Sequence, residues 1–186
     1  MAHIPLKEMQ AKPIKHKTYE RNGTMNSTLK NLMNIQINKE LASAYLYKAI
    51  ACIFAELNLD GFAHWYTVQA GEEVEHADRF ITYLHDQCEE VTLTDIAVIP
   101  FKHESILDML EESLAQEIEV TSSINNIYSE ALALHDYRAM KFLDWFISEQ
   151  HEEEVNAQTM IDKYQNFVCD CGCGLYELDK ELSERT

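Results

Sequence analysis

Four glutamates stand out in this chain because each interrupts an apolar stripe near the middle of a predicted helix. They are Glu40, Glu73, Glu117 and Glu153. None of the four stripes contains a Lys or Arg that could neutralise these carboxylates. Burying several unpaired carboxylates would cost more free energy than the net stability of a domain. The pattern therefore predicts that bound metal ions supply the compensating positive charge.

His76 adds an imidazole to this predicted site. It follows Glu73 by three residues, so both side chains lie on one helical face and can bind one metal pair. A single Glu-x-x-His pair is usually solvated helix surface, but four helices that each carry a mid-stripe carboxylate form a more specific pattern. Four carboxylates balance the charge of two divalent ions. Oxygen ligands with few imidazoles suit Fe(II) and Mn(II), and carboxylates favour the ferric state, so the site favours oxidation.

Two aromatic residues are expected near the same level of the helices. Tyr47 follows Glu40 by two turns, and Trp145 lies on the fourth helical segment. Both side chains could donate electrons to a metal site. The alternative is that they only fill the core, which is the more common role of aromatic residues at helical spacing.

Further glutamates lie on helical faces next to the inward set, in sequence stretches rich in acidic residues. They are Glu72, Glu149 and Glu152. One interpretation is a third metal position that passes iron between the oxidation site and a mineral surface. The alternative is a solvated acidic face, and periodicity alone does not decide between the two.

The four stripes require four long helices. The first two are predicted at about residues 28–56 and 60–88; the other two are marked by stripes at 107–131 and 139–164, with breaks near 134–136 and after 167. Each is about 28 to 30 residues, or roughly 42 to 45 Å long. Asp60 is expected to cap the second helix. Residues 89–103, with Pro100, are predicted to form a connection that can extend roughly 50 Å. The second and third helices can therefore run parallel, which predicts an all-α, ferritin-like four-helix bundle with one long crossover.

Composition supports an all-helical soluble protein. The chain has five Gly and three Pro among 186 residues, so long helices are permitted. Its net charge of −17 argues against nucleic acid or an anionic membrane surface as the main partner. No apolar run reaches the roughly 20 residues that span a bilayer, and no signal peptide is recognisable. The five cysteines do not resemble a secreted disulfide framework. We therefore expect a cytoplasmic location.

Three regions are expected along the chain: an arm at 1–25, the bundle at 26–167, and a cysteine-containing turn with a short helix at 168–186. The arm carries five basic residues against two glutamates, and we interpret it as a mobile tail, although it could dock on an acidic neighbour or DNA. The turn contains Cys169, Cys171 and Cys173. These are either incidental thiols or a soft-metal or redox group.

Several motifs resemble the non-haem bacterial ferritins, and the resemblance runs from about residue 31 to residue 182. The most specific are Asn38-Lys39-Glu40-Leu41, Glu72-Glu73-Val74-Glu75-His76, Phe142-Leu143-Asp144-Trp145-Phe146-Ile147-Ser148-Glu149-Gln150-His151-Glu152-Glu153-Glu154, and Leu175-Tyr176-Glu177-Leu178-Asp179-Lys180-Glu181-Leu182. The resemblance implies a homo-oligomeric shell of 24 subunits that oxidises Fe(II) with dioxygen and stores ferric oxyhydroxide. In such a shell each subunit acts as a ferroxidase.

The resemblance also implies a set of site residues. One iron would be held by Glu40, Glu73 and His76, and its neighbour by Glu73, Glu117 and Glu153. A third site would consist of Glu72, Glu149, Glu152 and Glu153, with Tyr47, Trp145 and Gln150 close by. The fourth helix offers Gln150-x-x-Glu153 where symmetric di-iron bundles carry a second Glu-x-x-His, so the sequence gives no reason to expect haem.

Two other functions remain open on the sequence. A storage subunit whose bundle centre is only structural would load iron through its acidic surface without fast oxidation. A di-iron oxygenase acting on an organic substrate would need an access pocket beside the metals. The complete inward ligand set disfavours the first, and the tightly packed Phe, Tyr and Leu of the stripes disfavour the second.

Overall fold

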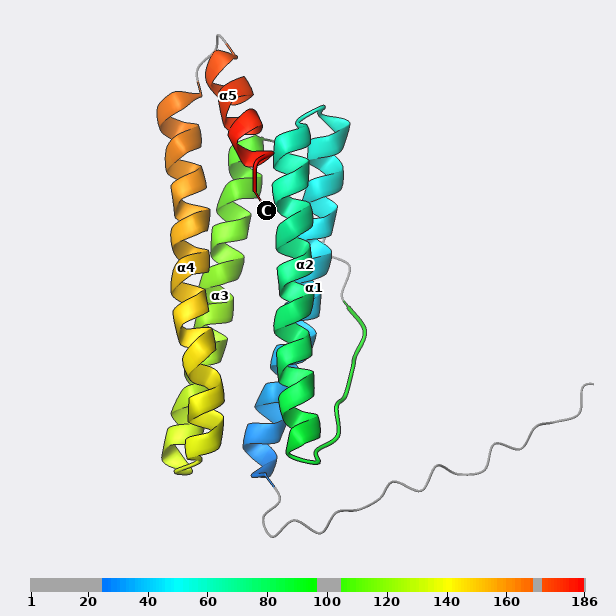
Figure 1. Cartoon of the computed structure of the whole chain (residues 1–186), viewed down its shortest axis with the longest axis vertical. Helices are drawn as coiled ribbons and strands as arrows, with labels where there is room; N and C mark the ends of the chain where they lie inside the picture. The colour runs from blue at the N-terminus through cyan, green and yellow to red at the C-terminus, as the bar shows by residue number, and fades with distance from the viewer. Residues whose placement is uncertain (1–24, 97–104, 169–171, 186) are drawn as a thin grey trace, which may run out of the picture.

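The computed structural model describes residues 25–96, 105–168 and 172–185. Within these ranges the chain forms four long helices in a bundle, with a short fifth helix at one end (Figure 1). The helices are α1 (Ser27–Glu56), α2 (Asp60–Asp86), α3 (Ile106–Ala133), α4 (Tyr137–Phe167) and α5 (Cys173–Leu182). This confirms the predicted fold class. The basic arm at 1–24, Pro100, Cys169 and Cys171 lie outside the described residues, so the predictions about them stay predictions.

The described part of the crossover, residues 89–96, lies along the bundle, and α2 and α3 run in the same direction (Figure 1). Two asparagines of α1 hold the first part of the crossover in place. Asn34 accepts a hydrogen bond from the Thr92 amide at 2.6 Å and donates one to the Glu90 carbonyl at 3.2 Å. Asn38 accepts from the Thr94 amide at 2.7 Å and donates to the Thr92 carbonyl at 2.8 Å. These contacts pair the extended backbone of the crossover with side chains of α1.

The helix starts show where sequence rules succeed and where one fails. Ser105 and Asp108 form a reciprocal capping box at α3, as local capping residues commonly do. At α2, however, the expected cap by Asp60 is wrong. The N-cap is Leu59, which makes no side-chain hydrogen bond, and Asp60 is already inside the helix. The amide of Phe62 instead donates to the carboxylate of Asp179 in α5 at 3.0 Å, so the start of α2 is capped from a distant helix.

Two separate apolar clusters fill the bundle, and a polar layer lies between them. One cluster adjoins α5 and includes Phe54 and Phe62, whose ring centroids are 4.8 Å apart. The other lies toward the opposite end and includes Phe80 and Phe146, 4.4 Å apart. The two apolar clusters therefore shield the polar layer from both ends of the bundle.

None of the helices in the described ranges is long and apolar enough to cross a membrane.

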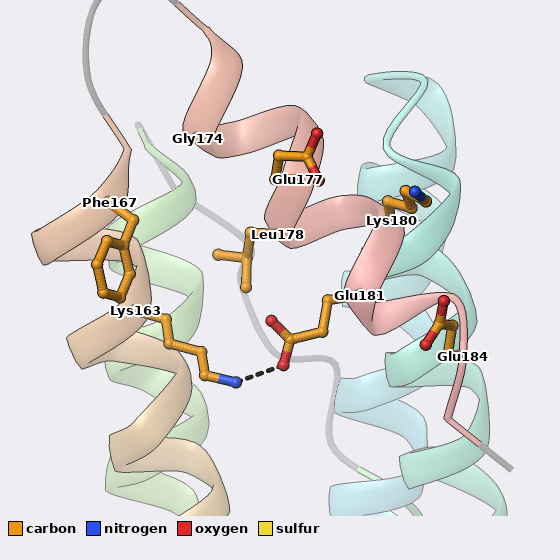
Figure 2. A pocket seen from close by; sticks show the side chains of 8 residues that line it. All are labelled: Lys163, Phe167, Gly174, Glu177, Leu178, Lys180, Glu181 and Glu184. Carbon is orange, nitrogen blue, oxygen red and sulfur yellow. Dashed lines mark hydrogen bonds and ion pairs between the residues drawn. The ribbon is translucent and has the colours of Figure 1, made fainter.

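The short helix α5 packs against α2 and α4. Leu178 is buried, and Figure 2 shows it on the inner side of α5, with Lys163 of α4 reaching Glu181 in an ion pair. Two glycines allow the close approach of the backbones. A Cβ atom on Gly61 would lie 1.6 Å from the Asp179 carbonyl oxygen, and one on Gly174 would lie 1.8 Å from a carbonyl oxygen of α4.

Replacing Gly61 by Ala is therefore expected to displace α5 and to destabilise the protein by about 1 to 3 kcal/mol, the usual cost of overpacking. Gly71 provides a matched control on the same helix, because a Cβ there would meet nothing within 4 Å. Gly71→Ala should stabilise the protein by about 0.5 to 1 kcal/mol through helix propensity. Thermal unfolding of both variants and proteolysis of α5 measure this. A Gly61→Ala protein as stable as the parent would contradict the docking of α5 described above.

Candidate metal centre

The polar layer consists of five predicted ligand side chains contributed by four helices. Glu40 comes from α1, Glu73 and His76 from α2, Glu117 from α3 and Glu153 from α4. All five are at most 5 % exposed. Each lies on the apolar face of its helix, so the helical periodicity that buries the stripes also turns these groups inward.

Potential ligand atoms converge in two groups that share His76. In the first group, atoms of Glu40, Glu73 and His76 all lie within 4.8 Å of one another. In the second, His76 is joined within the same distance by Glu149 and Glu153. Both groups are carboxylate-rich with one imidazole, which is a donor set that suits Fe(II) or Mn(II).

Glu117 belongs to neither group, and two other side chains hold its carboxylate. The hydroxyl of Tyr47 donates a hydrogen bond to one oxygen of Glu117. The side-chain amide of Gln150 donates to the other oxygen at 3.3 Å. Tyr47 and Gln150 therefore lie at the centre, as the sequence predicted, and both act on Glu117.

Buried atoms without partners test whether a cation fits this centre. Glu40 Oε2 and His76 Nδ1 make no hydrogen bond, although both are fully enclosed. The nearest carboxylate oxygen to His76 Nδ1 is on Glu73, at 3.4 Å. A buried acceptor without a partner costs about 1 to 3 kcal/mol, and a cation bound between these atoms would remove that cost. The residues present therefore fit a metal ion.

Comparison with known proteins identifies the family. A model described as a ferritin-like domain matches residues 30–167, about three quarters of the chain. The chain belongs to the ferritin family. It is 36 % identical over 162 residues to a bacterial non-heme ferritin of Staphylococcus saprophyticus, covering 87 % of this chain and 96 % of that one. A bacterial non-heme ferritin of Campylobacter jejuni is 36 % identical over 151 residues, covering 81 % and 90 %.

Solved structures agree with this assignment. An open pore ferritin from the hyperthermophilic archaeon Archaeoglobus fulgidus superposes with a TM-score of 0.84 at 32 % identity, covering 88 % of this chain and 99 % of that one. Membership of the ferritin family supports a role in iron storage. It also confirms the resemblance to non-haem bacterial ferritins predicted from the motifs.

In this ferritin the centre holds protons when no metal is bound. Burial, together with the charge of Glu73, raises the pKa of Glu117 to about 8. Burial and the charges of Glu117 and Glu73 raise the pKa of Glu153 to about 8. Burial lowers the pKa of His76, but the carboxylates of Glu73, Glu153 and Glu149 together outweigh this effect and leave the pKa above its usual value. Binding of divalent cations must therefore release protons at neutral pH.

Two glutamines on the ferritin stripes were not predicted as site residues. Gln36 donates to Glu40 at 2.9 Å, and Gln69 donates to both Glu73 at 3.1 Å and Glu153 at 2.9 Å. The signal was present in the sequence, because each glutamine precedes a stripe glutamate by four residues. An amide N–H can hold a carboxylate in place without neutralising it, which leaves the charge available to a cation.

The aromatic residue Trp145 lies beside the centre, as predicted. Its ring is 5.5 Å from the ring of His76, and the Arg79 guanidinium lies 3.8 Å from its centroid. A tryptophan in contact with a potential ligand can exchange electrons with it, and it can equally hold the imidazole in place. The contact itself is consistent with either role.

The predicted third site is only partly assembled in this ferritin. Glu149 joins Glu153 through the second ligand group, as described above. Glu72 instead forms an ion pair with Arg185, and Glu152 is exposed to solvent. Arg185 lies 113 positions after Glu72 in the chain, so the sequence did not indicate this partner. The third site stays a prediction.

Proposed function

We propose that this chain is an iron-storage subunit that oxidises Fe(II) with dioxygen at the buried centre. One observation carries the proposal: four helices bury a glutamate each, and possible ligand atoms of three of these glutamates lie within 4.8 Å of His76. Within the described part of the chain, no Lys or Arg forms an ion pair with any of these four glutamates. The charge is therefore left for a cationic substrate to neutralise.

In this proposal two Fe(II) ions share Glu73, and each gives one electron to the same dioxygen, which is thereby reduced to the peroxide level. Glu40, Glu73 and His76 bind the first ion, and Glu117 and Glu153 bind the second, with Glu73 between the two. Carboxylate ligands stabilise Fe(III) relative to Fe(II), so they lower the free energy of the oxidised product. Glu117 and Glu153 lose their protons as iron binds, and Gln69 and Gln150 keep the freed carboxylates oriented.

The ferric product would then leave toward the interior of a homo-oligomeric shell. The predicted third position, with Glu149, Glu153, Glu72 and Glu152, provides carboxylates on that route. The likeness to cage-forming relatives, including the open pore ferritin of Archaeoglobus fulgidus, supports a shell, and we propose 24 subunits. No haem is included in this proposal, and the cytoplasmic location stays a prediction. An organic substrate is disfavoured because apolar clusters enclose both ends of the polar layer.

Stopped-flow absorbance tests the proposal. Metal-free protein is mixed with two Fe(II) per subunit and oxygenated buffer, and dioxygen consumption is recorded in parallel. We expect a fast visible transient followed by a stable ferric signal, with saturation at two Fe(II) per subunit. Slow oxidation that grows in proportion to added iron, without a fast phase, would indicate a passive storage subunit. Light scattering on the same sample measures whether the particle mass is 24 times the 21.5 kDa of the chain.

A further inference from the structure

The residues after α5 bring a cation to the edge of the metal centre. The guanidinium of Arg185 forms an ion pair with Glu72 of α2. Both of its terminal nitrogens also donate to the side-chain oxygen of Gln69, each at 3.0 Å. Its carbon lies 4.3 Å from the ring centroid of Trp65. The side chain of Arg185 is only 18 % exposed, so the guanidinium is held by three residues of one helix.

The position of Arg185 depends on the docking of α5. Asp179 caps α2, and the Gly61 contact lets the two backbones touch, as described above. The backbone carbonyl of Arg185 lies 2.8 Å from Nε2 of His64, which fixes the main chain beside α2. A flexible surface arginine could pair with Glu72 only intermittently. Here both the main chain and the side chain are held.

Gln69 connects Arg185 to the ligands. Because its amide oxygen accepts both hydrogen bonds from Arg185, its amide nitrogen must point the other way. That nitrogen donates to Glu73 and Glu153, which belong to α2 and α4. One side chain therefore separates the guanidinium from two predicted iron ligands.

We propose that Arg185 is a resident counter-ion at the outer edge of the centre, which holds Glu72 in the metal-free protein and is displaced from it by a divalent cation. The inference rests on the proposed function. Guanidinium and metal compete for the same carboxylate, and the positive charge of Arg185 disfavours a second cation beside it. Arginine stays charged at any physiological pH, so this competition is constant. Arg185 thus weakens cation binding at Glu72. Only ions that bind the Glu72 carboxylate more strongly than the guanidinium does will displace Arg185.

Calorimetric titration of the metal-free protein with Zn(II) tests this, because Zn(II) binds carboxylates and histidine but is not oxidised. Arg185→Gln is expected to tighten the weakest Zn(II) site by about tenfold, since a charge-assisted hydrogen bond of about 1.5 kcal/mol no longer competes. Arg185→Lys keeps the positive charge, so its affinity for Zn(II) should stay near that of the parent protein. Lys180→Gln removes the same charge from an exposed position of α5 and should leave the Zn(II) affinity unchanged. Unchanged or weaker Zn(II) binding in Arg185→Gln would overturn the proposal.

A double-mutant cycle separates competition from a general charge effect. In a Glu72→Gln background the shared carboxylate is gone, so Arg185→Gln should give no further tightening. An equal increase in Zn(II) affinity in the parent and in the Glu72→Gln background would show that Arg185 does not act through Glu72. Thermal unfolding of each variant establishes that α5 is still docked.

A third measurement leaves Arg185 intact. Trp65 and Trp145 are the two tryptophans of the chain, so Trp145→Phe makes Trp65 the only indole reporter. Zn(II) should change the fluorescence of Trp65 as the guanidinium moves, and Glu72→Gln should abolish that change. A constant Trp65 signal at saturating Zn(II) would refute the displacement. None of these readouts involves iron oxidation, so failure of the ferroxidase proposal would be recognised separately.

Discussion

Glu73→Ala is expected to slow the fast phase of Fe(II) oxidation by on the order of 100-fold or more. In the proposed function Glu73 lies between the two iron positions, and its oxygens also lie near His76 and Gln69. Its loss removes a ligand from each ion and one of the four charges that balance the pair. Stopped-flow absorbance at two Fe(II) per subunit measures the rate.

A matched control separates the loss of a ligand from the loss of a negative charge. Glu75→Ala removes the same charge two residues away, from an exposed position on the other face of α2. It should oxidise iron at the parent rate. Circular dichroism and particle size of both variants establish that the bundle and its assembly are retained. Equal oxidation rates for Glu73→Ala and the parent would contradict the proposal that Fe(II) is oxidised at this centre.

The stability of the metal-free protein is expected to fall as the pH rises from about 5 to about 8. The folded state keeps protons on Glu117 and Glu153 up to a pKa of about 8, whereas the unfolded chain releases them near the usual value of 4.5. Between these limits the folded state binds more protons, so raising the pH favours unfolding. His76 acts in the same direction, because its folded-state pKa is also raised. Thermal unfolding at successive pH values measures the trend.

Divalent metal should reverse this trend, because it binds the deprotonated carboxylates. With Zn(II) at about 100 times its dissociation constant, each site adds about 2.7 kcal/mol to the stability. The gain should be larger at pH 8 than at pH 5, where protons compete. The double variant Glu117→Gln and Glu153→Gln keeps the shape of both side chains but cannot titrate, so its metal-free stability should vary less with pH. A parent protein whose metal-free stability rises from pH 5 to pH 8 would contradict the assignment.

Most of the fold and the burial of the four glutamates could be predicted because both follow from local spacing. Glu40, Glu73, Glu117 and Glu153 lie on apolar stripes, and a stripe must face the core whatever the neighbouring helices are. The crossover followed from its length and Pro100. These features depend on periodicity and chain geometry alone.

Contacts between distant segments could not be predicted in the same way. Asp60 had the right residue type and position for a cap, yet Asp179 caps α2 because α5 packs there. Arg185 reaches Glu72 through the same packing, and no spacing rule relates residues 113 positions apart. The spacing of four residues between Gln69 and Glu73 is visible in the sequence, but the orientation of the Gln69 amide depends on Arg185.

The order of the helices also affects how the centre forms during folding. α1 and α2 are joined by a tight turn, as are α3 and α4, so each pair is a helical hairpin with local contacts that can form early. Glu40, Glu73 and His76 all belong to the first hairpin, whereas Glu117 and Glu153 belong to the second. One ion could therefore be captured by a half-folded chain, but the second requires both hairpins to be docked. Occupancy of the complete proposed pair would thus report that the whole bundle has assembled. Iron bound too early would be held by an intermediate that lacks Glu117 and Glu153.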